Sequence, residues 1–137
     1  MKNNRKGFTL IEMLVVVAIV GLLSSVVVVG VGGARQKARD AKRVADVRQI
    51  QTWFETKYTT QYPDVTIYPA ELPSDPSTGV AYSICRSTDN QGYGIGVTLE
   101  AVGNRPSGGI AASQLPEGCS LSVTCAATGV VYCVTSK

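Results

Sequence analysis

The sequence contains no histidine, and this absence removes several classes of function at once. Without an imidazole the chain has no Ser–His or Cys–His dyad, and it lacks the usual partner of cysteine in zinc sites. Its carboxylates show no motif or helical pairing typical of a general acid and base. Asp64, Asp75 and Asp89 are too scattered for a calcium loop. We therefore predict that the protein is not an enzyme and needs no metal or cofactor.

The chain also lacks a strong excess of charge of either sign. It has 13 Lys and Arg against 10 Asp and Glu, but Lys2, Arg5 and Lys6 all precede the first apolar run. Without these three residues the charges balance, so the chain has no broad basic field to attract nucleic acid. A basic stretch does precede Trp53 and Phe54, and a solvated helix face explains it better than a nucleic-acid surface. Its members are Arg35, Lys37, Arg39, Lys42, Arg43 and Arg48.

Between Phe8 and Val31 the only charged residue is Glu12. A helix needs about 20 apolar residues to cross a bilayer, so this run predicts a membrane span, which we place at residues 8–33. A cleaved secretory signal would have a shorter apolar core, followed by a small-residue processing site such as Ala-x-Ala. No such site follows Val31. The chain should therefore cross a membrane once.

Proline is absent from residues 1–62, so nothing interrupts a helix there. Residues 34–62 are predicted to be the amphipathic half of the same helix. A helix from Phe8 to Tyr58 would form a rod of ~75 Å at 1.5 Å per residue. Its expected apolar stripe is Ala34, Ala38, Ala41, Val44, Val47, Ile50, Phe54 and Tyr58. Polar residues expected on the other faces are Arg39, Lys42, Arg43, Asp46 and Gln49.

Residues 63–137 are expected to form a small β-rich head that begins with a proline-rich loop, residues 63–79. Runs of β-branched and aromatic residues predict about four strands. We expect a sheet that is solvated on one face and packed by the other on the stripe ending at Phe54 and Tyr58. The glycines of residues 92–96 should place small residues on one strand face. The predicted strands are Val80–Cys85, Tyr93–Glu100, Leu121–Cys125 and Val130–Thr135, with turns at 89–92 and 126–129. The predicted fold class is therefore α+β.

Four cysteines lie in the last 53 residues, at Cys85, Cys119, Cys125 and Cys133. Two disulfides in an oxidising compartment are favoured, because a small head with a thin core gains roughly 2–4 kcal/mol from each bridge. The alternative is buried free thiols in a cytosolic domain. Four cysteines permit three pairings. We favour one bridge within the final hairpin.

The most informative segment reads Lys6-Gly7-Phe8-Thr9-Leu10-Ile11-Glu12-Met13-Leu14. Residues 6–31 closely resemble the N-terminus of precursors in the type IV pilin and type II secretion pseudopilin superfamily. The stretch from Ala38 to Pro69 is similar more loosely, through Asp46, Tyr58 and the Tyr68-Pro69 pair. The resemblance implies a pilin-like fold and a prepilin peptidase that removes the leader, residues 1–7, by cutting after Gly7. The same enzyme would N-methylate the new terminal residue, Phe8.

Glu12 also has a physical interpretation. A charged residue at the centre of a membrane helix costs ~2.5–3.5 kcal/mol on insertion scales, so Glu12 should have a partner or lie near the interface. After cleavage, the amine of Phe8 is a positive charge one helical turn away. A salt bridge between Glu12 of one subunit and the Phe8 amine of another would neutralise both and set the axial register of a filament. The alternative is that Glu12 snorkels to the headgroups.

The predicted function is that of a structural subunit of a type IV pilus or pseudopilus. The resemblance implies a homo-oligomeric helical filament, the prepilin peptidase and an inner-membrane assembly platform as partners. Five Lys and Arg follow the span and three precede it, which by the positive-inside rule alone would place the head in the cytoplasm. The leader motif and the cysteines favour an extracytoplasmic head. The alternative function is an uncleaved, signal-anchored extracytoplasmic binding or adhesin module.

Overall fold

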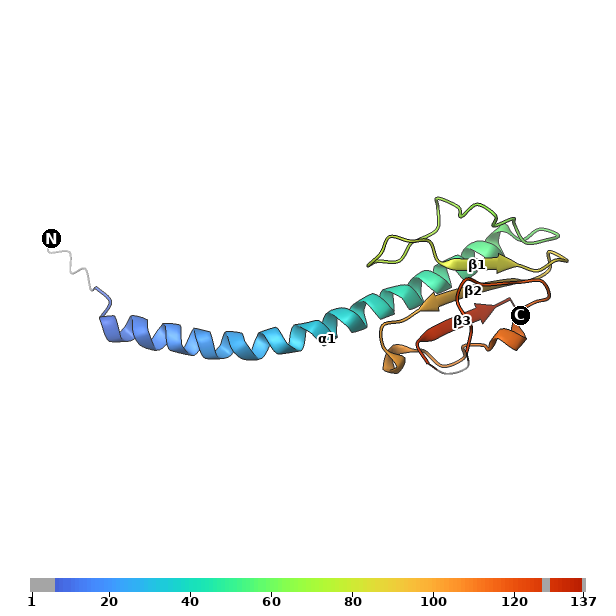
Figure 1. Ribbon diagram of the computed structural model, residues 1–137. Coiled ribbons are helices and arrows are strands. Elements are labelled where there is room, and N and C mark those ends of the chain that lie inside the picture. The colour runs from blue at the N-terminus through green and yellow to red at the C-terminus, as the bar shows by residue number, and fades with distance from the viewer. Residues whose placement is uncertain (1–6, 127–128, 137) are drawn as a thin grey trace, which may run out of the picture. The chain divides into compact units, whose positions relative to one another are not determined.

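The computed structural model describes residues 7–126 and 129–136, without the side chains of residues 28–30. The chain divides into two compact units, Met1–Arg35 and Gln36–Lys137, which are described separately. The elements are the helix α1 (Leu10–Lys57), strands β1 (Ser83–Arg86), β2 (Tyr93–Thr98) and β3 (Val131–Thr135), and the short 3-10 helices η1 (Val102–Asn104) and η2 (Ala112–Gln114) (Figure 1). The predicted α+β class, a long N-terminal helix followed by a small antiparallel sheet, is confirmed.

The first unit contains the apolar half of α1. An 18-residue window of this helix has a mean hydropathy of 3.0, which makes the helix long and apolar enough to cross a membrane. The hydroxyls of Ser24 and Ser25 donate to the carbonyls of Val20 and Leu22, so these polar groups are satisfied within the helix. The large apolar side chains described in this segment are exposed. Such a surface suits lipid or another apolar helix. The leader residues 1–6 lie outside the described residues.

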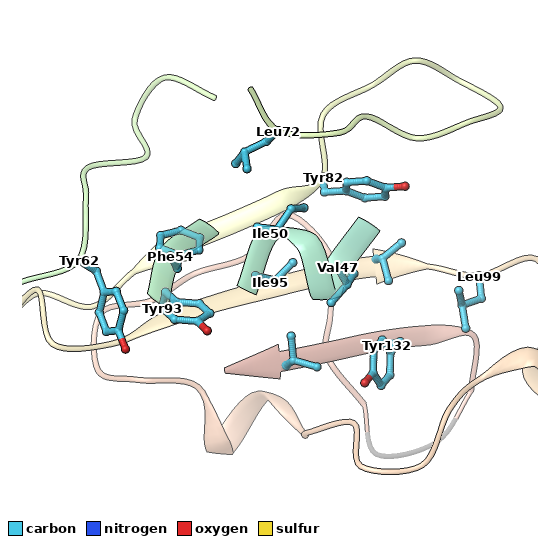
Figure 2. Packing of buried hydrophobic residues seen from close by; sticks show 12 residues of the cluster. Val47, Ile50, Phe54, Tyr62, Leu72, Tyr82, Tyr93, Ile95, Leu99 and Tyr132 are labelled. Atoms are coloured by element: carbon cyan, nitrogen blue, oxygen red, sulfur yellow. The ribbon is translucent and has the colours of Figure 1, made fainter. Parts of the chain in front are cut away.

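In the second unit, three antiparallel strands form a sheet in the order β1-β2-β3. Alternate residues of the central strand, Tyr93, Ile95 and Val97, are buried on the face that packs against α1. The ring of Phe54 on α1 stacks on Tyr93 with the ring centres 4.3 Å apart (Figure 2). Offset aromatic pairs of this kind add to the stability gained by burial. The core comprises Val47, Ile50, Phe54, Tyr62, Leu72, Tyr82, Tyr93, Ile95, Val97, Leu99, Tyr132 and Val134.

The opposite face of the sheet is covered, so the prediction of a solvated face is wrong. Gly94 and Gly96 lie on this face of β2, and the side chains of Leu115, Leu121 and Val123 pack against them. A Cβ atom at Gly94 would lie 2.7 Å from Cδ2 of Leu115, which is too close for an ordinary contact. The alternation of glycine with large residues is therefore explained, because glycine admits the chain segment that crosses the sheet.

That crossing segment also corrects the strand prediction. The structure gives Leu121–Cys125 no strand, and β3 pairs with β2 instead of with this segment. Two disulfides account for the difference, because they join Cys85 to Cys119 and Cys125 to Cys133. Each end of the segment is thereby tied to a different outer strand, so it lies across the sheet and not along its edge. The predicted turn at 126–129 includes residues 127–128, which lie outside the described residues.

The buried face of α1 in the second unit differs from the predicted stripe. Val47, Ile50 and Phe54 are fully buried as expected, but Tyr58 is 40% exposed. The prediction that Arg43 and Asp46 lie on solvated faces is wrong, since both are buried. Periodicity failed here because these two side chains have charged or hydrogen-bonding partners inside the unit. The alanines at 34, 38 and 41 are exposed.

Candidate processing and assembly site

The N-terminal segment is organised by two side chains that lie three residues apart. The backbone N–H of Thr9 donates to Oε2 of Glu12 at 2.9 Å, and the Thr9 hydroxyl donates to the same oxygen at 2.8 Å. In return, the backbone N–H of Glu12 donates to the Thr9 hydroxyl at 3.3 Å. This reciprocal arrangement is a capping box, and α1 begins at the next residue, Leu10. Glu12 therefore helps to start the helix, although its charge interrupts the apolar run of residues.

Residues Gly7 to Thr9 lie outside the helix and are exposed. The peptide bond between Gly7 and Phe8 therefore lies in an exposed segment before the first helical turn. The side chain of Phe8 is 80% exposed. The structure thus brings the three predicted site residues Gly7, Phe8 and Glu12 into one short segment, while Lys6 lies outside the described residues.

Glu12 is a single carboxylate on an apolar surface. It lines an open hollow of the helix surface with Phe8, Ile11, Val15 and Val16. A carboxylate that becomes buried with such neighbours needs a positive or hydrogen-bonding partner, because an unpaired buried charge is very costly. A cut after Gly7 would create an amine on Phe8, directly before the N–H of Thr9 that already binds Glu12. The segment can therefore present a carboxylate and an amine close together.

Thr9 is the site residue that the sequence analysis missed. Its signal was present, because Thr9 and Glu12 fit the S/T-x-x-E pattern of a capping box directly before an apolar run. Glu12 therefore has two roles, as a charge in an apolar segment and as the glutamate of the capping box. Thr9 supplies two of the hydrogen bonds that hold the carboxylate.

A second cluster of charged residues lies in the other unit, around Arg43, which is 5% exposed. The Arg43 guanidinium forms ion pairs with Asp75 at 2.6 Å, Asp40 at 2.8 Å and Glu100 at 3.0 Å. It also donates to the hydroxyl of Ser77 at 2.6 Å. This guanidinium holds the pKa of Asp75 well below its usual range. One buried cation is therefore shared by three carboxylates that come from three different parts of the chain.

Asp40 completes this cluster and is fully buried. It accepts hydrogen bonds from the backbone N–H groups of Glu100 and Ala101 and from the side-chain amide of Asn104. Burial opposes ionisation of Asp40, but these donors and Arg43 outweigh that effect and hold its pKa below the usual value. The cluster ties the loops at 74–78 and 99–104 to α1. Its carboxylates are already saturated, so its arrangement supports a structural role.

The sequence predicted only the local parts of this cluster. Asp40 and Arg43 lie three residues apart, a spacing that favours ion pairs along a helix, and the same rule fits the separate pair Lys42–Asp46, four residues apart. The partners Asp75 and Glu100 carried no local signal. Within residues 7–126 and 129–136, no group of three His, Cys, Asp or Glu residues is arranged so that it could hold a metal ion.

The exposed apolar helix and the capped segment before it can be compared with known proteins. The model of the prokaryotic N-terminal methylation motif matches residues 2–28. The chain carries this motif and is homologous to type II secretion system core protein G, so the resemblance inferred from residues 6–31 is confirmed.

Three of these relatives illustrate the extent of the similarity. The chain is 49% identical over 53 residues to the core protein G of Vibrio cholerae, which covers 37% of this chain and 36% of that protein. For Aeromonas hydrophila the identity is 44% over 50 residues, covering 36% of this chain and 35% of the relative. For Pectobacterium carotovorum it is 32% over 97 residues, covering 53% and 62%. The chain thus spans about a third of the length of most of these relatives. No solved structure matches the chain significantly.

Proposed function

We propose that the protein is a structural subunit of a pseudopilus, made as a membrane-held prepilin and polymerised through its N-terminal helix. The observation that carries this proposal is the capping box at Thr9 and Glu12, which places one carboxylate at the start of an exposed apolar helix. The name of the relatives, type II secretion system core protein G, favours a pseudopilus over a long extracellular pilus. This function requires no catalytic step by the chain itself.

In the proposed pathway, residues 1–7 are the leader, and residues 8–33 hold the precursor in the cytoplasmic membrane. A prepilin peptidase cuts the exposed bond after Gly7 and methylates the amine of Phe8. Residues 34–62 continue the helix, and residues 63–137 form the head on the extracytoplasmic side. The two disulfides support this orientation, because disulfides persist mainly in oxidising compartments.

Assembly then replaces lipid around the apolar helix by the helices of other copies. The large apolar side chains exposed in the first unit suit both environments. Glu12 of one subunit pairs with the Phe8 amine of another, because the hydrogen bonds from Thr9 leave the negative charge of Glu12 without a cation once lipid and other helices cover it. This pairing sets the axial register, and an inner-membrane platform supplies subunits to the growing filament.

The proposal is tested by the mass and N-terminal sequence of the full chain after co-expression with a prepilin peptidase. The expected product begins at N-methylated Phe8. A Gly7→Val variant is the matched control, because the added side chain alters only the residue before the cut. It should stay unprocessed if the peptidase requires glycine at that position. An unprocessed wild-type chain, or one cut beyond Val31, would refute the proposal.

A second candidate function is an uncleaved, signal-anchored binding or adhesin module. The specific observation in its favour is that Glu12 is already satisfied within its own chain by both donors of Thr9. Glu12→Ala separates the two functions. It should block incorporation into filaments if Glu12 pairs between subunits, and it should be nearly silent if the head alone is functional.

A further inference from the structure

Charge is unevenly distributed within the second unit. Residues 36–57, the helical part, contain six basic and three acidic side chains, whereas residues 58–136 contain two basic and six acidic ones. Several of these are paired internally, through Arg39–Glu100, Lys42–Asp46 and the cluster around Arg43. The remaining charges therefore determine what the outside of the unit presents to a partner.

Three basic side chains of α1 in this unit, Lys37, Arg48 and Lys57, are exposed and form no ion pair in the described part of the chain. Lys57 is the last residue of the helix, whereas Lys37 and Arg48 lie along it. They are eleven residues apart, which is close to three helical turns, so they lie on one line of the helix about 16 Å apart. Ala41 and Ala45 beside this line are exposed and small, which leaves both cations accessible. We call Lys37 and Arg48 the basic line. Glu55 lies seven residues after Arg48 on the same side of the helix, and its carboxylate accepts a hydrogen bond from the Tyr93 hydroxyl at 2.9 Å.

Two acidic residues, Asp89 and Glu117, lie on two neighbouring loops of the same unit. The backbone N–H of Thr88 donates to the carbonyl of Glu117 at 3.0 Å, which brings the two loops together. Both acidic residues are exposed, and the structure gives the Glu117 carboxylate no hydrogen bond or ion pair with a described residue. We call Asp89 and Glu117 the acidic tip.

The β1–β2 turn, which carries Asp89, lies near the C-terminal end of α1 (Figure 1). Tyr58 donates to the side chain of Gln91 at 3.0 Å, and Gln91 donates to the carbonyl of Thr60. Lys37 lies twenty residues before the helix end, or about 30 Å along the axis, and Arg48 lies nine residues before it, or about 14 Å. The basic line and the acidic tip are therefore separate surfaces of one subunit.

We propose that the acidic tip of one subunit docks on the basic line of a second copy of this chain. The inference rests on the proposed filament function and names a surface that assembly would use outside the apolar helices. A helical filament needs heterologous contacts, in which two different surfaces of the same chain meet. Opposite charges on two separate surfaces meet this requirement, and they also disfavour contact between like surfaces.

The first test is zero-length carbodiimide cross-linking of the full chain in membranes and in sheared filaments. Copies labelled with light and heavy nitrogen are mixed, so that links between chains can be recognised by mass. An amide between Lys37 of one copy and Glu117 or Asp89 of another is the expected product. Absence of this mixed-label link in both preparations would overturn the inference.

The second test is a charge swap. Arg48→Glu and Glu117→Lys should each lower the yield of filaments and of the mixed-label link roughly fivefold, and the double variant should recover most of both. The matched control is Thr66→Glu/Ala70→Glu, which changes the net charge as much as Arg48→Glu does but on an exposed loop. The control should assemble normally.

The outcomes separate this inference from the proposed function. If the wild-type chain forms filaments and both charge-reversal variants assemble equally well, the docking contact is overturned and the pseudopilus role stays intact. A mixed-label link in membranes without any filaments would support the contact and refute the pseudopilus role. Loss of binding to phosphatidylglycerol vesicles in Arg48→Glu, with no effect of Glu117→Lys on assembly, would replace the second copy by a lipid surface.

Discussion

The two halves of α1 treat their side chains in opposite ways. In the first unit, large apolar residues such as Leu22 and Val26 are about 70% exposed. In the second unit, the same helix buries the charged residues Asp40, Arg43 and Asp46 beside its apolar core. A folded domain normally buries its leucines and exposes its arginines, so both halves of α1 depart from the usual pattern. The buried charges of the second unit have partners within that unit, whereas the apolar surface of the first unit needs lipid or other copies to cover it.

The largest expected effect comes from breaking the buried cluster of the second unit. Arg43→Met should lower its stability by about 3–5 kcal/mol, because Asp40 and Asp75 would lose the cation that compensates their burial. Thermal unfolding in detergent, followed by Trp53 fluorescence, measures the change. Arg39→Met is the control, since Arg39 is 38% exposed and its pair with Glu100 should be worth no more than about 1 kcal/mol. Equal losses in both variants would contradict the structure.

Removal of the disulfides should have the next largest effect, again confined to the second unit. The Cys85–Cys119 bridge spans 34 residues and the Cys125–Cys133 bridge spans 8. In the chain-entropy model, replacing each pair by alanine should cost about 4 and about 2–3 kcal/mol respectively. Chemical denaturation of the two double variants tests the order, and a larger loss from the shorter loop would show that chain entropy is not the main cause.

Acid should lower the stability of the second unit by about 1–3 kcal/mol through its buried carboxylates, Asp40 and Asp75, and leave the apolar helix of the first unit unchanged. Hydrogen bonds and the guanidinium groups of Arg39 and Arg43 lower the pKa values of Asp40, Asp75 and Glu100, although burial alone would raise them. The stability they contribute is fully present above about pH 4, the unfolded range for carboxylates, and is lost as the pH falls below it. Trp53 fluorescence should therefore report unfolding below pH 4, before the helical circular dichroism of the apolar segment changes. Simultaneous loss of both signals would be inconsistent with two separate units.

The smallest expected effect concerns the start of the first unit. Thr9→Val should remove the hydroxyl contacts of the capping box and destabilise the first helical turn by about 0.5–2 kcal/mol. Hydrogen exchange at the Glu12 amide, which donates to that hydroxyl, should become faster. Thr9→Ser keeps the hydroxyl and should retain the slow exchange. Unchanged exchange in the valine variant would show that the box does not form in the membrane.

Local patterns predicted most of the elements. The apolar run and the absence of proline predicted a helix from Phe8 to Tyr58, and α1 runs from Leu10 to Lys57. β2 and β3 lie within the predicted runs, although β1 begins at Ser83 and not at Val80. These predictions succeeded because helix and strand periodicity depend on neighbouring residues.

Contacts between distant residues explain what was missed. Arg43 was expected on a solvated face because its partners Asp75 and Glu100 lie 32 and 57 residues away. Leu121–Cys125 has the composition of a strand, but the disulfides at its two ends direct it across the sheet. At the candidate site, the segment around Gly7 and Glu12 was found from its motif, and its processing and assembly roles stay predictions.

The glycines at 94 and 96 restrict how the head can diverge among related proteins. Because the crossing segment with Leu115, Leu121 and Val123 rests where side chains would otherwise project, the route of this segment depends on two missing methyl groups. Any relative with larger residues at these positions must send the corresponding segment along another path. Loop and strand should therefore be exchanged between relatives only as a matched set, which applies equally to natural recombination and to the grafting of foreign epitopes onto this head.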